Sequence, residues 1–113
     1  MTSVTVSTAE TIRTLNDAFR RTFVGGMVMI TAGVEAMPVE QRRSLLRKVR
    51  AFDAFTDDND PHGEHDFGAI GEGGVGCFWK IEYYDRATEM GSPDPADPTV
   101  TTRVLTIMCA DEY

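Results

Sequence analysis

The sequence predicts an α+β fold in which two helices pack on one face of a mainly antiparallel sheet of three to four strands. Two stretches carry apolar residues at helical spacing, and a short apolar run lies between them. The second half of the chain has a hairpin pattern followed by a last apolar strand. Elements in this order bury their apolar sides as a layer of helices on a sheet. The 113 residues fit a single domain, 1–113, with residues 1–6 as a loose N-terminal tail.

The first helix is predicted to begin after Ser7. Its hydroxyl can accept a hydrogen bond from the first turn, and Glu10 stands three residues later, as in a capping box. The apolar stripe that follows consists of Ile12, Leu15, Phe19 and Phe23. Gly25 and Gly26 end this helix. Residues 27–31 are predicted to be a buried strand, because this apolar run is too short for a helix.

The second helix is predicted to begin at Pro38, whose missing amide would be unpaired in a first turn anyway. Its buried face consists of Leu45, Leu46, Val49, Phe52 and Phe55. The opposite face is basic and consists of Arg42, Arg43, Arg47, Lys48 and Arg50. Such a face is typical of a solvated helix flank, and without interleaved aromatic residues we expect no direct binding of nucleic acid. An accessory role, in which Arg43, Arg47 and Arg50 capture a transcriptional or toxin-neutralising partner, is an alternative.

A hairpin is predicted around Gly73 and Gly74, the pair that a tight turn accepts best. In its second arm Cys77, Trp79, Ile81 and Tyr83 alternate with Phe78, Lys80, Glu82 and Tyr84. One face of this arm should therefore meet the helices, while the other can be partly open. Residues 91–99 hold three prolines and predict a stiff loop, and the apolar run 104–109 predicts a strand buried on both sides. Cys77 and Cys109 stand in these apolar strands and are expected to be free core thiols.

Charge is unevenly distributed along the chain, whose net charge is -7. Residues 1–55 carry eight Lys and Arg against five acids, and residues 56–113 carry three against thirteen. The second part should repel nucleic acid and favour basic partners. No apolar run approaches the roughly 20 residues of a membrane helix, and the N-terminus lacks the basic and apolar blocks of a secretory signal, so we expect a cytoplasmic protein without membrane partners.

The stretch TDDNDPHGEHDFG, residues 56–68, concentrates five carboxylates and two histidines. A calcium-loop template that starts at Asp58 finds Asp60 at its third position and Gly63 at its sixth. The template then fails, because His62 stands at the fifth position and Ala69 at the twelfth, where a bidentate acid is needed. Calcium binding by this template is therefore not predicted.

This stretch also gives little indication that it binds zinc or another metal. His62 and His65 are three residues apart, which suits zinc only on a helix, and Pro61 and Gly63 disfavour a helix. We therefore expect no metal and no cofactor. The candidate ligands, if a metal is bound, are His62, Glu64, His65 and Asp66.

An enzymatic interpretation would centre on Glu64, His65 and Asp66. His65 would act as a general base, Glu64 or Asp66 would orient it, and Lys80 on the adjacent strand would serve as an electrophile. No nucleophile elbow, phosphate-binding glycine loop or HExxH motif accompanies these residues. The simplest interpretation is a turn whose aspartates satisfy local amides.

Three segments resemble a family of small bacterial proteins known only as a domain of unknown function. These segments are DNDPHGEHDFG (58–68), FWKIEYYDR (78–86) and GSPDPADPTVTTRVLTIMCADEY (91–113). The earlier stretches IRTLNDAFRRT and MITAGV are also similar, whereas Met90 and Cys109 depart from the expected pattern. The resemblance implies a free-standing small protein, often carried on plasmids and prophages near anti-restriction genes. It supplies no catalytic residues, because none are established for the family.

The function expected from charge and resemblance is that of a small acidic binding protein of a mobile element. It would inhibit a host defence complex, as an anti-CRISPR or anti-restriction protein, by occupying a basic surface on a nucleic-acid-binding subunit. The alternative is a metal-dependent or acid-base enzyme centred on Glu64, His65 and Asp66. The acidic surface is predicted to consist of Asp57, Asp58, Asp60, Glu64, Asp66, Asp85, Glu89, Asp94 and Asp97.

Overall fold

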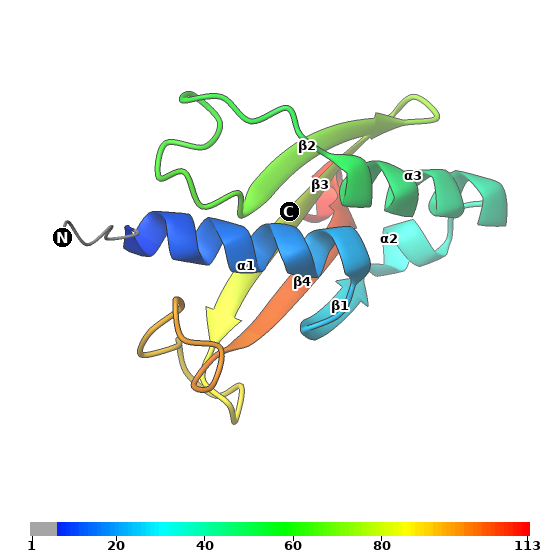
Figure 1. Cartoon of the computed structure of the whole chain (residues 1–113). Coiled ribbons are helices and arrows are strands. Elements are labelled where there is room, and N and C mark those ends of the chain that lie inside the picture. Colours follow the sequence, from blue (N-terminus) through cyan, green and yellow to red (C-terminus); the bar gives the residue numbers. More distant parts are fainter. Residues whose placement is uncertain (1–6) are drawn as a thin grey trace, which may run out of the picture.

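The computed structural model of the chain describes residues 7–113, so the expected tail, residues 1–6, lies outside the described part. The helices are α1 (Thr8–Thr22), α2 (Ala32–Glu35), α3 (Val39–Ala51) and the 3-10 turn η1 (Ala110–Glu112). The strands are β1 (Gly26–Ile30), β2 (Phe67–Glu72), β3 (Val75–Tyr84) and β4 (Thr102–Cys109). Helices and a four-stranded sheet confirm the α+β class (Figure 1).

The sheet has the strand order β1-β4-β3-β2, and β4, which holds the run predicted to be buried on both sides, is one of its two inner strands. β2, β3 and β4 are antiparallel neighbours, but β1 runs parallel to β4, so the sheet is mixed. A parallel pair needs a long crossover connection between its strands, and here α2, α3 and the hairpin supply it. The direction of β1 relative to β4 therefore depends on the path of this long connection. The five-residue apolar run of β1 does not itself encode that direction.

The helices α1 and α3 cover one face of the sheet (Figure 1). Between the layers lies a core in which Trp79, Leu105 and Ile107 of the sheet are fully buried together with Leu45 and Val49 of α3. Truncating a buried Leu or Ile of this kind to Ala typically costs about 2 to 5 kcal/mol. This core fixes which strand residues face α1, and so positions the polar residues described below.

Two hairpin glycines and one strand glycine have specific geometric roles. Gly73 and Gly74 both have positive φ, 58° and 80°, as the predicted tight turn requires. Gly68 pairs with Trp79 across β2 and β3, and a Cβ at Gly68 would collide with the indole ring. A glycine at this position therefore lets the largest core side chain lie flat against β2.

The predicted second helix ends earlier than its apolar pattern suggests. It stops at Ala51, so Phe52 and Phe55 belong to the following loop and not to the helix, which corrects the prediction. Arg20 of α1 accounts for the early end, because it donates hydrogen bonds to the carbonyl oxygens of Val49 (3.1 Å) and Phe52 (2.9 Å). Both rings still pack beside Trp79, as the pattern indicated.

The start of α1 agrees with the sequence, but α1 ends at Thr22, before the predicted glycines, and Phe23 caps it in the left-handed conformation. The strand predicted at residues 27–31 is β1, Gly26–Ile30, and the prediction that it is buried was wrong, because β1 is an edge strand whose side chains are mostly exposed. The Ser7 hydroxyl accepts from the amide of Glu10 at 3.1 Å and caps α1. Cys77 and Cys109 are free and buried, which confirms their assignment to the core. In residues 7–113 no helix has the length and apolar character needed to span a membrane.

Candidate functional site

A buried polar centre lies between α1, the loop 53–66 and the sheet. Asn16 of α1 is completely buried, and its side-chain amide donates to the Glu64 carbonyl oxygen (2.9 Å) and to the Tyr83 hydroxyl (2.8 Å). Its oxygen accepts from Nε of Arg103 on β4 at 2.8 Å. One side chain thus connects α1, β3, β4 and the acidic loop, and its donors and acceptor are used.

Tyr83 and Arg103 are held in this centre by further hydrogen bonds. The Tyr83 hydroxyl donates to Oε1 of Glu64 at 2.9 Å, and burial together with this neighbouring carboxylate raises the pKa of Tyr83. Burial lowers the pKa of Arg103, whose guanidinium also donates to the carbonyl oxygen of Pro95. Arg103 thereby attaches the loop 85–101 to the same centre.

His65 is the second anchor of the acidic loop. Its Nδ1 lies 2.9 Å from Oδ1 of Asp17, which is also 3.0 Å from the Arg20 guanidinium. Although burial raises the pKa of Asp17, the hydrogen bonds from His65 and Arg20 outweigh it and lower the pKa overall. The imidazole also stacks on Phe55 with the ring centroids 3.7 Å apart. The backbone of His65 has a φ of 54°, which turns the ring toward α1.

Asp60 completes the surroundings of His65. Its Oδ1 accepts from the His65 amide at 3.2 Å, its Oδ2 lies 3.6 Å from Nε2, and its side chain is only 6% exposed. The ring edge borders a hollow of about 220 Å³. This hollow is lined by Arg13, Phe55, Thr56, Asp57, Asp60, Gly63 and His65. The arrangement presents an oriented imidazole at a small polar depression.

The predicted catalytic trio does not assemble around His65. The side chain of Glu64 is engaged by Tyr83, and Asp17 with Asp60 holds the imidazole, so Glu64 and Asp66 are not its orienting groups. Burial and the Glu64 charge raise the pKa of Asp66.

Lys80, the predicted electrophile, is also far from this role. It pairs with Glu82 at 2.7 Å, and both side chains belong to the set on the sheet face opposite Trp79. The residues that sequence reasoning missed are Asn16, Asp17, Arg20 and Arg103. One signal existed, since Asn16 and Arg20 are polar yet recur at helical spacing beside Ile12 and Phe19, on the predicted apolar stripe.

The nine predicted acidic-surface residues divide by exposure. Asp57, Asp58, Glu89 and Asp94 are exposed, and Asp60, Glu64, Asp66, Asp85 and Asp97 are partly buried. The two loops that carry them, residues 53–66 and 85–101, flank the N-terminal half of α1 on opposite sides (Figure 1). They lie at the same end of the molecule without forming one continuous stretch. We call these two loops the acidic end.

The basic residues of α3 lie toward the opposite end. Arg21, Arg47 and Arg50 line a hollow of about 220 Å³ where α1 and α3 both end. Arg50 donates from Nε to the carbonyl oxygen of Arg21 at 2.9 Å, and its guanidinium lies over the ring of Phe23. Basic side chains are favourable at helix C-termini, so this cluster has a structural explanation.

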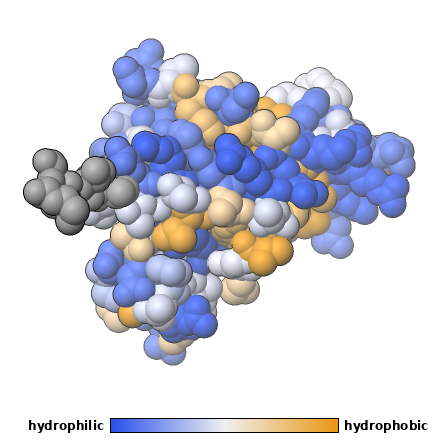
Figure 2. Space-filling view, viewed as in Figure 1, coloured by the Kyte–Doolittle hydropathy of each residue, from blue (hydrophilic) through white to orange (hydrophobic). Residues whose placement is uncertain are grey.

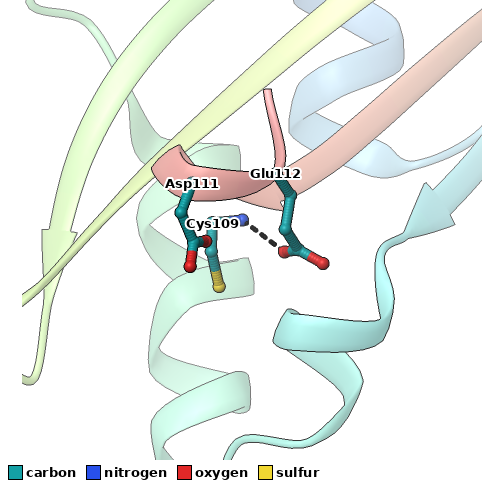
Figure 3. A group of neighbouring side chains, drawn as sticks. All are labelled: Cys109, Asp111 and Glu112. Atoms are coloured by element: carbon teal, nitrogen blue, oxygen red, sulfur yellow. Dashed lines mark hydrogen bonds between the residues drawn. The ribbon is translucent and has the colours of Figure 1, made fainter.

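A third cluster, Cys109, Asp111 and Glu112, comes close enough to suggest a metal site (Figure 3). Glu112, however, already accepts hydrogen bonds from the Thr31 hydroxyl (2.6 Å) and from the amides of Cys109 (2.9 Å) and Gly33 (2.9 Å). These bonds lower the pKa of Glu112 to about 2. In Figure 3 its carboxylate points toward α2. The cluster therefore serves as a cap that fastens η1 to α2.

The candidate ligands of the acidic loop form no such group. Within residues 7–113, His62, Glu64, His65 and Asp66 do not bring three ligand atoms together at metal-binding distances. The side chains of Glu64 and His65 serve the other contacts described above.

The fold and its polar centre define a small α+β protein in which a four-stranded mixed sheet carries helices on one face and an acidic loop anchored beside α1. The chain belongs to the family described as Protein of unknown function (DUF3768), whose model matches residues 30–112. No curated protein matches the chain. No solved structure matches it either.

Proposed function

We propose that the chain is a binding protein of a mobile element whose acidic end engages a basic surface of a protein partner. The partner is a nucleic-acid-binding subunit of a host defence complex, and binding inhibits that complex in the manner of an anti-CRISPR or anti-restriction protein. The resemblance to small proteins carried near anti-restriction genes motivates the choice of partner. The charge arrangement of the molecule supports the mode of binding.

The supporting observation is the separation of charge along the molecule. Two loops that are distant in sequence lie at one end of the molecule, and α3 with its basic residues extends toward the other (Figure 1). The loops carry the exposed residues Asp57, Asp58, Glu89 and Asp94. Clefts and surfaces of one sign steer partners of the opposite sign during association. This steering is screened beyond about 8 Å at physiological ionic strength, so binding should weaken in salt.

The carboxylates of the second loop keep acceptor capacity for such a partner. Asp94 accepts from the amide of Ala96 with Oδ1, and Asp97 accepts from Thr99 with Oδ1 alone. The Oδ2 atoms take part in none of these turn bonds. A guanidinium of the partner can therefore donate a charge-assisted hydrogen bond to these Oδ2 atoms.

A transformation assay tests this proposal. The chain is expressed in cells that carry a restriction or CRISPR system, and the transformation efficiency of a targeted plasmid is measured; we expect the efficiency to rise. A variant that combines Asp57→Asn, Asp58→Asn, Glu89→Gln and Asp94→Asn should lose the effect. The control Glu35→Gln with Glu40→Gln removes exposed charge near the basic residues and should keep it.

Two results would contradict the proposal in different ways. An unchanged efficiency with the wild-type chain in every system would exclude inhibition of host defence. Equal loss in the acidic-end variant and its control would exclude the acidic end as the binding surface.

Acid-base catalysis at His65 is a second candidate, because an imidazole held between Asp17 and Asp60 borders a hollow. Purified protein can be tested with p-nitrophenyl esters and phosphates as probes. A hydrolysis rate that falls in His65→Gln but not in His62→Gln would support catalysis. Equal rates in both variants and the wild type would rule it out for these substrates.

A further inference from the structure

The strand β1 is an edge of the sheet, bonded to β4 on one side only among the described residues. The amide of Thr31, directly after β1, donates to the carbonyl oxygen of Ile107 on the β4 side at 3.1 Å. Backbone groups alternate in direction along a strand, so those of Val28 and Ile30 face the free edge. Unpaired edge groups of this kind are a template for another strand.

This edge lacks the features that usually protect edge strands. The strand Gly26–Ile30 has the sequence GMVMI, with no charged residue and no proline. Side chains here are unusually exposed: Val24 is 74% exposed, Met27 49%, Met29 51% and Ile30 36%. They are four of the eight large exposed hydrophobic residues in the described chain. Figure 2 shows an apolar patch where β1 lies in Figure 1.

A hollow lies next to this edge on the sheet face that α1 and α3 leave uncovered. Its volume is about 320 Å³. Its lining consists of Met27, Met29, Tyr84, Thr88, Val104 and Thr106. Met27, Met29 and Val104 give part of this lining an apolar surface that can accommodate an aliphatic side chain of an added strand. Thr88 belongs to the loop 85–101, so the hollow joins β1 to the acidic end.

The charge next to β1 selects the kind of strand that fits. Gly26 pairs with Arg103 at the start of β4, directly after the loop 85–101, and Thr88 of this loop lines the same hollow as Met27 and Met29. This loop carries four carboxylates against one arginine, Arg86. An added strand therefore meets a neutral apolar edge along its length and negative charge at one end.

We propose that β1 is the docking edge for the partner, which adds an extended segment as a fifth strand. Alternate apolar side chains of the segment cover Met27 and Met29, and a lysine or arginine at the end beside Gly26 faces the loop 85–101. This inference rests on the proposed function, because it names the segment with which the basic partner binds. A second copy of the chain is disfavoured as the occupant, since each copy carries a net charge of -7.

A designed peptide tests the docking edge. The probe is a nine-residue peptide of alternating Val and Thr with two lysines at one end, made with the lysines at either terminus to cover both strand directions. One of the two should bind, with protection from hydrogen exchange at the amides of Val28 and Ile30 in NMR spectra. Met29→Lys should raise the Kd of this peptide at least about tenfold.

Matched controls separate strand addition from nonspecific binding. Val39→Lys introduces the same charge at an equally exposed apolar residue of α3 (50% exposed) and should leave the Kd unchanged. Methylating alternate backbone nitrogens of the peptide, or replacing its lysines by glutamates, should abolish binding. Binding of the methylated or glutamate peptide with equal affinity would overturn the proposal. The proposal would also be overturned if, without peptide, the protection of the Val28 and Ile30 amides from hydrogen exchange increased with protein concentration. This result would show that two copies of the chain pair through β1.

The transformation assay distinguishes failure of this inference from failure of the proposed function. If Met29→Lys inhibits host defence as well as the wild type, while the acidic-end variant does not, the docking edge is wrong and the function stands. If the wild-type chain does not inhibit, the proposed function fails, and with it the identity of the partner.

Discussion

The two acidic loops are similar in composition but are held in different ways. The loop 53–66 is fastened to α1 over long range, through His65 to Asp17 and through the Glu64 carbonyl to Asn16. In the loop 85–101, by contrast, the carboxylates bond mainly to amides a few residues away, as Asp94 does to Ala96. A carboxylate contributes substantially to folding only where its partner is buried and fixed. The first loop is therefore anchored by His65 and the Glu64 carbonyl and leaves Asp57 and Asp58 exposed, while the second loop is held mainly by local turn bonds.

The largest effect is expected from Asn16→Ala, which detaches the first loop from the sheet. It leaves Nε of the buried Arg103 without its acceptor and removes the donor to the Glu64 carbonyl. Unsatisfied buried groups cost about 1 to 3 kcal/mol each, so the free energy of unfolding should fall by about 3 kcal/mol. Urea unfolding measures the loss, with Thr14→Ala on the exposed side of α1 as a control. Similar losses in both variants would refute the central role of Asn16.

A smaller loss is expected from His65→Ala. The variant removes the stack on Phe55 and the hydrogen bond to Asp17, and should lower the free energy of unfolding by about 2 kcal/mol. His62→Ala is the matched control, because His62 is exposed and a surface change usually stays within about 0.5 kcal/mol. If the two histidines behave alike, the long-range anchoring of the first loop is not what stabilises it.

The pH dependence of stability should show opposite contributions of Asp17 and Asp66. The pKa of Asp17 lies below its ordinary 3.8, so its contribution is present above pH 3.8 and is lost as the pH falls through the lower folded value. The pKa of Asp66 is raised above 3.8, so ionised Asp66 costs stability at neutral pH. At pH 7, Asp17→Asn should lower the thermal midpoint and Asp66→Asn should raise it. Calorimetry from pH 7 to 3 checks both signs, and shifts in the same direction would contradict this account.

The smallest effects are expected from Asp58→Asn and Asp94→Asn, one in each loop. Both side chains are exposed, and Asn can accept the turn hydrogen bond that Asp94 makes. Each variant should change the free energy of unfolding by no more than about 0.5 kcal/mol. A larger loss in Asp94→Asn would mean that the second loop depends on the charge of this carboxylate for stability.

Periodicity and turn chemistry were sufficient to predict most of the elements. The Ser7 cap, the Gly73 and Gly74 turn and the central strand with Cys109 are where the patterns place them, because each depends on residues close in sequence. The early end of α3 and the orientation of His65 were not predictable in this way. Both depend on α1 side chains, Arg20 and Asp17, that lie more than 25 positions away.

By itself the sequence determined the α+β class, the excess of negative charge after residue 55 and the free core thiols, since composition and local spacing encode these properties directly. Only the tertiary structure decided which carboxylates turn inward and which stay exposed. It also decided that β1 runs parallel to β4 and ends the sheet with an unprotected apolar edge. The physical reason is that the packing of the helices on the sheet brings distant segments together. This packing determines which groups a carboxylate contacts and which strand β1 pairs with, and a local sequence pattern does not contain this information.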